Sequence, residues 1–148
     1  MIQWLLIWVI RITSQVDVVN VYVPPVNVSS GKQTIIIIQV QVQDGYHIQA
    51  HKSMDPLLIK TTLFVDKAKH LKTGEPVYPR GGKLRLEGTD VWLDVYSGRF
   101  EISVPLKVTR QAQKGLSLLN AVLHYQACDA KNCFQPATLS FQIPVQVN

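Results

Sequence analysis

The sequence predicts an all-β fold, an immunoglobulin-like antiparallel β-sandwich of about nine strands. Three observations carry this prediction. Apolar and polar side chains alternate with a period of two after residue 16, helical periodicity is nearly absent, and turn residues separate the alternating segments at short intervals. The chain has 148 residues, of which 47% are hydrophobic and 17% charged, so it is long and apolar enough for one domain with a buried core.

Residues 1–15 precede the predicted domain, which spans residues 16–148. The apolar run from Trp4 to Ile10 has the length of the apolar core of a secretory signal, but no basic residue precedes it and no A-x-A cleavage site follows. It is too short to cross a bilayer as a helix, which takes about 20 residues. We interpret residues 1–15 as an incomplete signal or leader remnant, or as an edge strand.

The first predicted strands are β-branched or alternating segments that end at turn signals. Residues 16–23 form a strand that stops at Pro24-Pro25, which lack backbone donors. In residues 34–43 isoleucine and valine occupy one face and glutamine the other, so we expect one face to be buried. Asp44-Gly45 is a strong tight-turn signal and predicts a hairpin with the next strand, residues 46–50.

The middle of the chain combines short strands with a long polar connection. Residues 57–65 are predicted to be a strand, and residues 66–82, rich in lysine, glycine and proline, a functional or mobile loop. Residues 83–86 and 91–96 are predicted to be strands separated by a turn at Gly88.

The last part of the chain holds the clearest alternation. Residues 100–108 alternate regularly, and Pro105 within them indicates a sheet edge or a bulge. Residues 116–127 and 138–147 complete the predicted sandwich.

The two cysteines, Cys128 and Cys133, lie in the connection between the last two predicted strands, with four residues between them. A connection this short can bring the two sulfurs within bonding reach. A structural disulfide closing so small a loop contributes only about 2 kcal/mol of stability, so the spacing favours a redox-active pair over a structural disulfide. Both interpretations remain open at this point.

Other chemistries find less support in the sequence. Two thiolates can supply half of a zinc site, but no second cysteine pair exists, and His47 and His51 would lie about 13 Å apart along a strand. No nucleophile or phosphate-loop motif is present. The net charge of +5 raises nucleic acid as a partner, but the basic cluster in residues 67–85 lacks interleaved aromatic residues and is interpreted as a solvated face. We therefore predict neither a metal nor a nucleic acid as a ligand.

The segment Tyr125–Pro136, YQACDAKNCFQP, resembles the signature of the amino-terminal periplasmic domain of DsbD-type thiol:disulfide interchange proteins, in which Y-Q-A/G-C precedes a short loop and C-x-P-P follows. Asp44–Lys52 together with Asp55-Pro56 resembles the family's D-G-Y-H-I segment, and Glu101–Val108 resembles its strand ending in V-P-L-K-V. The resemblance covers about residues 16–147.

This resemblance implies an immunoglobulin-like domain in the periplasm or otherwise outside the cytoplasm. It implies a component of a protein-disulfide reductase without a cofactor, which takes electrons from a membrane electron donor and passes them to thioredoxin-like disulfide oxidoreductases, as in cytochrome c biogenesis. Cys133 would then form the mixed disulfide with the client and Cys128 would resolve it. The family's membrane and thioredoxin-like domains do not occur in the sequence, so we expect a separate subunit or a fragment of unknown oligomeric state.

The resemblance also implies a cap over the cysteine pair. The candidate cap is Glu75–Gly81, with Tyr78 as the aromatic lid and with Pro79 and Arg80 beside it. Residues expected to support the pair come from the two matching segments: Tyr125, Gln126, Phe134, Pro136 and Tyr46.

Two departures from the family bear on this interpretation. The connection between the cysteines is shorter by a single residue, and Gln135 stands where a proline is usual. The alternative function is a non-catalytic immunoglobulin-like module that binds a protein and has a structural disulfide. The reduction potential of the cysteine pair distinguishes the two functions.

Overall fold

The computed structural model describes residues 17–53 and 55–148, and the predicted leader or edge strand of residues 1–15 lies outside this part. All regular elements of the described residues are β-strands, which confirms the all-β prediction. Within these residues no helix has the length and apolar character needed to cross a membrane.

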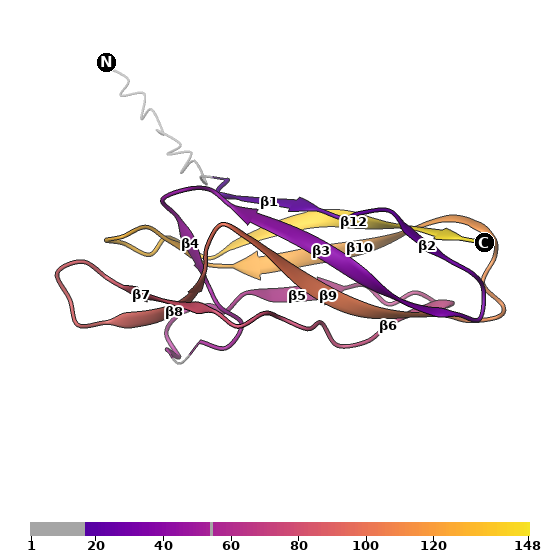
Figure 1. The fold of residues 1–148 in the computed structure, drawn as a ribbon, viewed down its shortest axis with the longest axis horizontal. Coiled ribbons are helices and arrows are strands. Elements are labelled where there is room, and N and C mark those ends of the chain that lie inside the picture. Colours follow the sequence, from indigo (N-terminus) through magenta and orange to yellow (C-terminus); the bar gives the residue numbers. More distant parts are fainter. Residues whose placement is uncertain (1–16, 54) are drawn as a thin grey trace, which may run out of the picture.

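The strands form three sheets of four strands each (Figure 1). The first has the order β1 (Val19–Tyr22), β3 (Gln33–Val42), β9 (Arg99–Val108), β6 (Leu71–Thr73). The second has the order β2 (Val26–Val28), β12 (Ala137–Val147), β10 (Gly115–Tyr125), β5 (Thr62–Val65). The third has the order β11 (Ala127–Cys128), β4 (His47–Gln49), β8 (Trp92–Tyr96), β7 (Gly82–Arg85). All pairs are antiparallel except β2 with β12, which are parallel.

The first two sheets enclose the main core and form an immunoglobulin-like sandwich. Alternate residues of each long strand face inward, as the period-two pattern requires. The first sheet contributes the completely buried Ile36 and Ile38 of β3 and Ile102 of β9. The second sheet contributes the completely buried Leu123 of β10 and Ile143 of β12.

The prediction of a β3–β4 hairpin is wrong, although its turn is present. The backbone N–H of Tyr46 donates to the carbonyl of Gln43 at 3.0 Å, and Gly45 adopts a positive φ of 84°. However, β3 already has β1 and β9 on its two edges, so the chain after Gly45 has no free edge of β3 to pair with. Instead the turn directs β4 into the third sheet, between β11 and β8.

The segment predicted as a polar loop, residues 66–82, contains β6, which pairs with β9. Pro105 therefore lies in an interior strand, but a bulge faces it: Thr73 pairs with Leu106 and Val77 with Ser103, so residues 74–76 lie opposite residues 104 and 105. A bulge beside Pro105 agrees with the sequence, whereas an edge position does not.

Three further features differ from the sequence prediction. The predicted strand over residues 57–65 is regular only in β5, residues 62–65, because turns and bends occupy the residues before it. The short strand β2 was not predicted, since three residues are too few to show an alternation. The small third sheet was not expected as a separate unit. Figure 1 shows β4, β7 and β8 near the end of the molecule opposite the C-terminus.

Candidate redox site

The cysteines lie in the tip of the long β10–β12 hairpin. The last pair of that hairpin joins Tyr125 to Ala137, and the connecting segment then crosses to the third sheet. There Ala127 pairs with Ile48 and Cys128 with His47. The site is therefore built where the main sandwich meets the small third sheet.

A tight turn of four residues joins Cys128 to Cys133. The two cysteines face each other as an isolated antiparallel bridge, and the N–H of Phe134 donates to the carbonyl of Ala127 at 2.8 Å. Inside the turn, the Oδ1 atom of Asp129 accepts hydrogen bonds from the N–H groups of Asn132 at 2.7 Å and Lys131 at 2.8 Å. Aspartate is suited to this position because its short carboxylate can bind backbone donors that follow it closely.

These backbone donors also affect the ionisation of the Asp129 carboxyl. The N–H groups of Asn132 and then Lys131 stabilise the charged carboxylate, and they lower the pKa of Asp129 from its usual value. A negative charge next to Cys128 is therefore present at any pH near neutrality.

The two sulfurs form a disulfide, with Cα atoms 3.9 Å apart. The cysteines differ in exposure: Cys128 is 0% exposed, whereas Cys133 is partly exposed. An attacking thiolate must reach a sulfur along the S–S axis, and of the two sulfurs that of Cys133 is the more accessible. No cluster of three or more histidine, cysteine or carboxylate residues suited to a metal occurs in residues 17–53 and 55–148.

The sequence did not identify Gln49 as a site residue. Its side chain is 0% exposed and its Nε2 atom donates to the Sγ atom of Cys128 at 3.2 Å. Gln49 ends β4, where it and the preceding Ile48 are both buried. A strand buried on both faces breaks the rule that polar residues point to solvent, so the alternation gave no signal.

The hairpin of β7 and β8 was also missed as part of the site. Leu93 and Val95 of β8 form a small buried cluster with Cys128, and Leu84, Leu86, Leu58 and Cys133 pack against it. The backbone N–H of Glu87, in the turn, donates to the carbonyl of Ala130 at 3.0 Å. The tip of one hairpin thus contacts the cysteine turn of the other.

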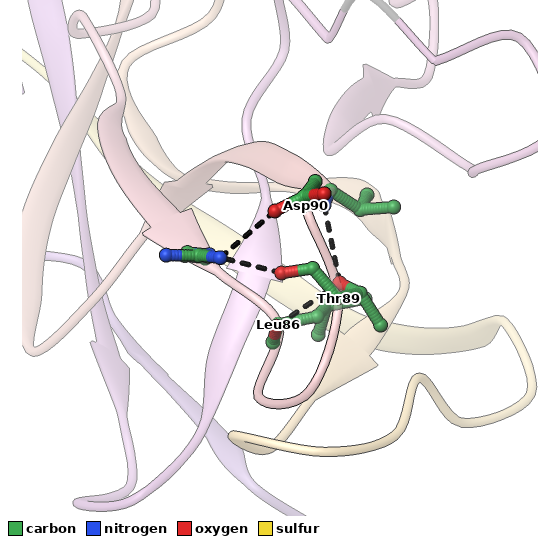
Figure 2. Close-up of polar contacts among 5 residues, drawn as sticks. Leu86, Thr89 and Asp90 are labelled. Atoms are coloured by element: carbon green, nitrogen blue, oxygen red, sulfur yellow. Dashed lines mark hydrogen bonds and ion pairs between the residues drawn. The ribbon is translucent and has the colours of Figure 1, made fainter.

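Side chains within the β7–β8 turn fix its shape. The hydroxyl of Thr89 donates to the carbonyl of Leu86 at 3.0 Å and accepts from the N–H of Val91 at 3.1 Å. Arg85 donates to the carbonyl of Thr89 and to the carboxylate of Asp90, both at 2.9 Å. Figure 2 shows these contacts around Leu86, Thr89 and Asp90. The turn that contacts the cysteine segment is therefore ordered by its own side chains.

Among the predicted supporting residues, three lie at the cysteine turn. Gln126 accepts the N–H of Ile59 at 2.8 Å through Oε1 and donates to the carbonyl of Phe134 at 3.0 Å through Nε2. The ring of Tyr46 lies 6.0 Å from that of Phe134. Gln126 thus joins the cysteine turn to the segment that precedes β5.

The other two predicted supporting residues lie differently. Tyr125 packs into the main core, and burial raises the pKa of its hydroxyl, with a smaller contribution from Asp17. Pro136 is exposed beyond the turn. Neither belongs to the apolar cluster that contains the cysteines.

Among the predicted cap residues, Tyr78 packs against the main core. The ring of Tyr78 stacks on His51 with centroids 3.7 Å apart, and its hydroxyl accepts the N–H of Leu63 at 2.9 Å. Burial raises the pKa of this hydroxyl, although the Leu63 hydrogen bond opposes the shift. The carbonyl of Pro79 accepts the Tyr96 hydroxyl at 2.9 Å, and Arg80 borders the same hollow of about 750 Å³ as Tyr78. A capping role for Tyr78, Pro79 and Arg80 stays a prediction.

The family model described as "Thiol:disulfide interchange protein DsbD, N-terminal" matches residues 15–144. The chain belongs to this family. The match contains both cysteines, β4 and the β7–β8 hairpin, so the whole candidate site lies within the DsbD N-terminal module.

A solved structure agrees with the fold. The N-terminal periplasmic domain of ScsB from Proteus mirabilis has a TM-score of 0.56 and 16% identity over 84% of this chain. This chain spans 44% of the length of that ScsB structure. The DsbD N-terminal domain of Neisseria meningitidis, in its reduced form, has a TM-score of 0.46 and 19% identity over 79% of this chain and 82% of its own. No curated protein sequence matches the chain.

Proposed function

We propose that Cys128 and Cys133 are a redox-active pair that transfers electrons to disulfides of thioredoxin-like oxidoreductases outside the cytoplasm. The observation that carries this proposal is the unequal exposure of the two cysteines of one disulfide in a DsbD N-terminal module. Cys133 is partly exposed and accessible to a partner, whereas Cys128 is completely buried and bonded to Cys133.

The reaction follows from this asymmetry. In the reduced pair, the thiolate of Cys133 attacks one sulfur of the client disulfide, which breaks the client S–S bond and leaves a client thiolate that takes up a proton. The Cys128 thiol then loses its proton and attacks the Cys133 sulfur of the mixed disulfide. The intramolecular disulfide forms and the second client thiolate leaves and is protonated, so the client gains two electrons and the pair loses two.

Exposed apolar side chains near the cysteine turn support a protein as the substrate. Leu57 is 87% exposed, Ile59 44% and Phe134 40%. Gln126 connects two of them, since it accepts the N–H of Ile59 and donates to the carbonyl of Phe134. Apolar groups beside a reactive sulfur are typical of a surface that a partner protein covers.

The proposal includes an electron donor and a cellular setting, which the family membership supports. A membrane electron donor reduces the Cys128–Cys133 disulfide again, and the clients include oxidoreductases of cytochrome c biogenesis. A periplasmic location is supported by the ScsB domain, which is itself periplasmic. In this setting the domain acts as the reductase component that carries electrons from the donor to the client.

The test is the equilibrium reduction potential of the pair in glutathione buffers, read by alkylation and mass shift. A potential above about −300 mV supports electron transfer, because structural disulfides lie below this value. In parallel, Cys128→Ser is mixed with a purified thioredoxin-fold oxidoreductase in its disulfide form and should trap a mixed disulfide through Cys133. Cys133→Ser is the matched control and should trap none. A pair that stays oxidised, with no trapped complex, would leave a structural disulfide in a binding module.

A further inference from the structure

The side chain of Gln49 is satisfied at only one of its two ends. Its Nε2 atom donates to the Sγ atom of Cys128 at 3.2 Å, but its Oε1 atom has no hydrogen-bond partner. In the part of the chain that the structure describes, this is the one buried side-chain nitrogen or oxygen without a partner. Such atoms are rare in folded proteins and each one calls for an explanation.

The backbone of Gln49 is held firmly, so the residue cannot leave the site. Its N–H donates to the carbonyl of Gln126 at 3.1 Å, and its carbonyl accepts the N–H of Thr61 at 3.2 Å and the Thr61 hydroxyl at 2.6 Å. On the other side it pairs with Val95 of β8. The backbone of Gln49 is therefore held beside the sulfur by contacts that do not involve the disulfide.

Turning the amide over does not solve the problem. A disulfide sulfur has no proton and can only accept, so the N–H end of the amide must face it. If Oε1 faced Cys128 instead, two acceptors would oppose each other and the N–H donors would lose their partner. In the oxidised protein one end of Gln49 is thus unsatisfied in either orientation.

We propose that Gln49 is a positioning residue that favours the reduced form of the pair. When the disulfide takes up two electrons and two protons, each sulfur becomes a thiol. The new S–H group of Cys128 forms beside the Gln49 amide, whose Nε2 atom lies 3.2 Å from the sulfur, and it donates a hydrogen bond to the Oε1 atom of that amide. Reduction removes the buried unsatisfied acceptor, which only the oxidised state contains.

The same amide can assist the resolving step of the proposed exchange. When Cys128 loses its proton, the thiolate becomes a strong acceptor for the N–H of Nε2, which already faces it. The Oε1 atom of Gln49 can therefore accept from the Cys128 thiol, and its Nε2 atom can donate to the Cys128 thiolate. The disulfide accepts only a weak hydrogen bond from Nε2. No charged group is needed at this buried position.

The first test compares reduction potentials and rests on the proposed function. Gln49→Met keeps the length of the side chain but removes both ends of the amide. We expect its equilibrium with glutathione to shift about tenfold toward the disulfide, which is a potential about 30 mV lower. Thr61→Val is the matched control, since it weakens the same strand without touching sulfur, and its potential should equal that of the wild type.

The outcomes separate the two proposals. A wild-type pair that no thiol buffer reduces contradicts the proposed function. A reducible wild-type pair whose potential is unchanged or raised in Gln49→Met contradicts the role of Gln49 alone. If Thr61→Val lowers the potential as much as Gln49→Met, the effect comes from local destabilisation and the proposal fails.

A second measurement needs neither reduction nor a Gln49 variant. In Cys133→Ala the Cys128 sulfur is a free thiol, and its S–H stretching band in the infrared reports directly on hydrogen bonding. We expect this band at the lower frequency of a thiol that donates to an amide oxygen. A band at the frequency of a free thiol overturns the proposal, even if Gln49→Met does not fold.

Discussion

Gly81 lies so close to Ala50 that the position has no room for a side chain. A Cβ atom on Gly81 would lie 2.7 Å from the Cβ of Ala50 and 3.1 Å from the carbonyl oxygen of Val95. Gly81 precedes β7, and Ala50 follows Gln49 at the end of β4. This close approach brings the chain that enters the β7–β8 hairpin onto the strands that hold the site.

The first prediction tests this contact. Gly81→Ala forces a methyl group against Ala50 and the backbone of β8, and we expect it to lower the free energy of unfolding by about 1–3 kcal/mol. Gly82→Ala is the adjacent control, because a Cβ there meets no atom within 4 Å. Urea unfolding of the oxidised protein measures both, and equal midpoints for the two variants would contradict the packing described here.

The second prediction concerns the shielding of the cysteines. Leu86 of the β7–β8 turn packs against the cluster that contains Cys128 and Cys133. In the reduced protein, Leu86→Ala should raise the rate of Cys133 alkylation by iodoacetamide several-fold, since it opens the apolar cover. Leu116→Ala removes an exposed leucine at the start of β10, whose other end leads to the cysteines, and should leave the rate unchanged.

The same assay decides between the two candidate caps. Tyr78 stacks on His51 and packs on the main core. If the loop of Tyr78, Pro79 and Arg80 covers the pair, Tyr78→Ala should raise the alkylation rate at least as much as Leu86→Ala. If the β7–β8 hairpin alone is the cover, Tyr78→Ala should lower stability with little change in rate.

These contacts show which features the sequence could predict. The long alternating strands β3, β9, β10 and β12 were predicted because their pattern is local and each has one buried face. The third sheet was not, because β4 and β11 have only three and two residues and pair with partners far away in the chain. Strands were predicted over residues 46–50, 83–86 and 91–96, where β4, β7 and β8 lie, but their pairing into a separate sheet was not.

The site followed the same division. The cysteine pair could be predicted because its sequence signature is contiguous. Gln49 could not be predicted, since β11, β8 and Thr61 bury it. The local alternation around Gln49 gives no sign of these neighbours. The contact of Leu86 with the cysteine cluster could not be predicted either, because it joins the tips of two hairpins that are distant in the sequence.

The third prediction is a pH dependence at Asp129. The N–H groups of Asn132 and Lys131 lower the pKa of this carboxyl in the folded protein. A group with a lowered folded-state pKa contributes its stability fully above its unfolded pKa of about 3.9 and loses it as the pH falls through the folded value. NMR titration of the Asp129 carboxyl should give a value below 3.9.

Two substitutions check the cause of this shift. Asp129→Asn keeps the oxygen that accepts both N–H groups, whereas Asp129→Ala removes it. In both variants, we expect the stability to lose the part of its acid dependence that comes from the Asp129 titration. Only Asp129→Ala should increase amide exchange at Lys131 and Asn132 near neutral pH. An Asp129 carboxyl that titrates at or above 3.9 would contradict the turn geometry.

The fourth prediction concerns Gln126, which joins the cysteine turn to the segment before β5. Gln126→Met keeps the length of the side chain but leaves the Ile59 N–H and the Phe134 carbonyl without their partner. We expect faster hydrogen exchange of the Ile59 amide and a loss of about 1–3 kcal/mol of stability. Gln142→Met is the control, because the Gln142 side chain bonds to Asn120 on the exposed face of the β10–β12 pair and should cost less than about 0.5 kcal/mol. An Ile59 amide that exchanges at the wild-type rate in Gln126→Met would show that the two segments are held together by other contacts, and the Ile59–Phe134 apolar surface would then not depend on Gln126.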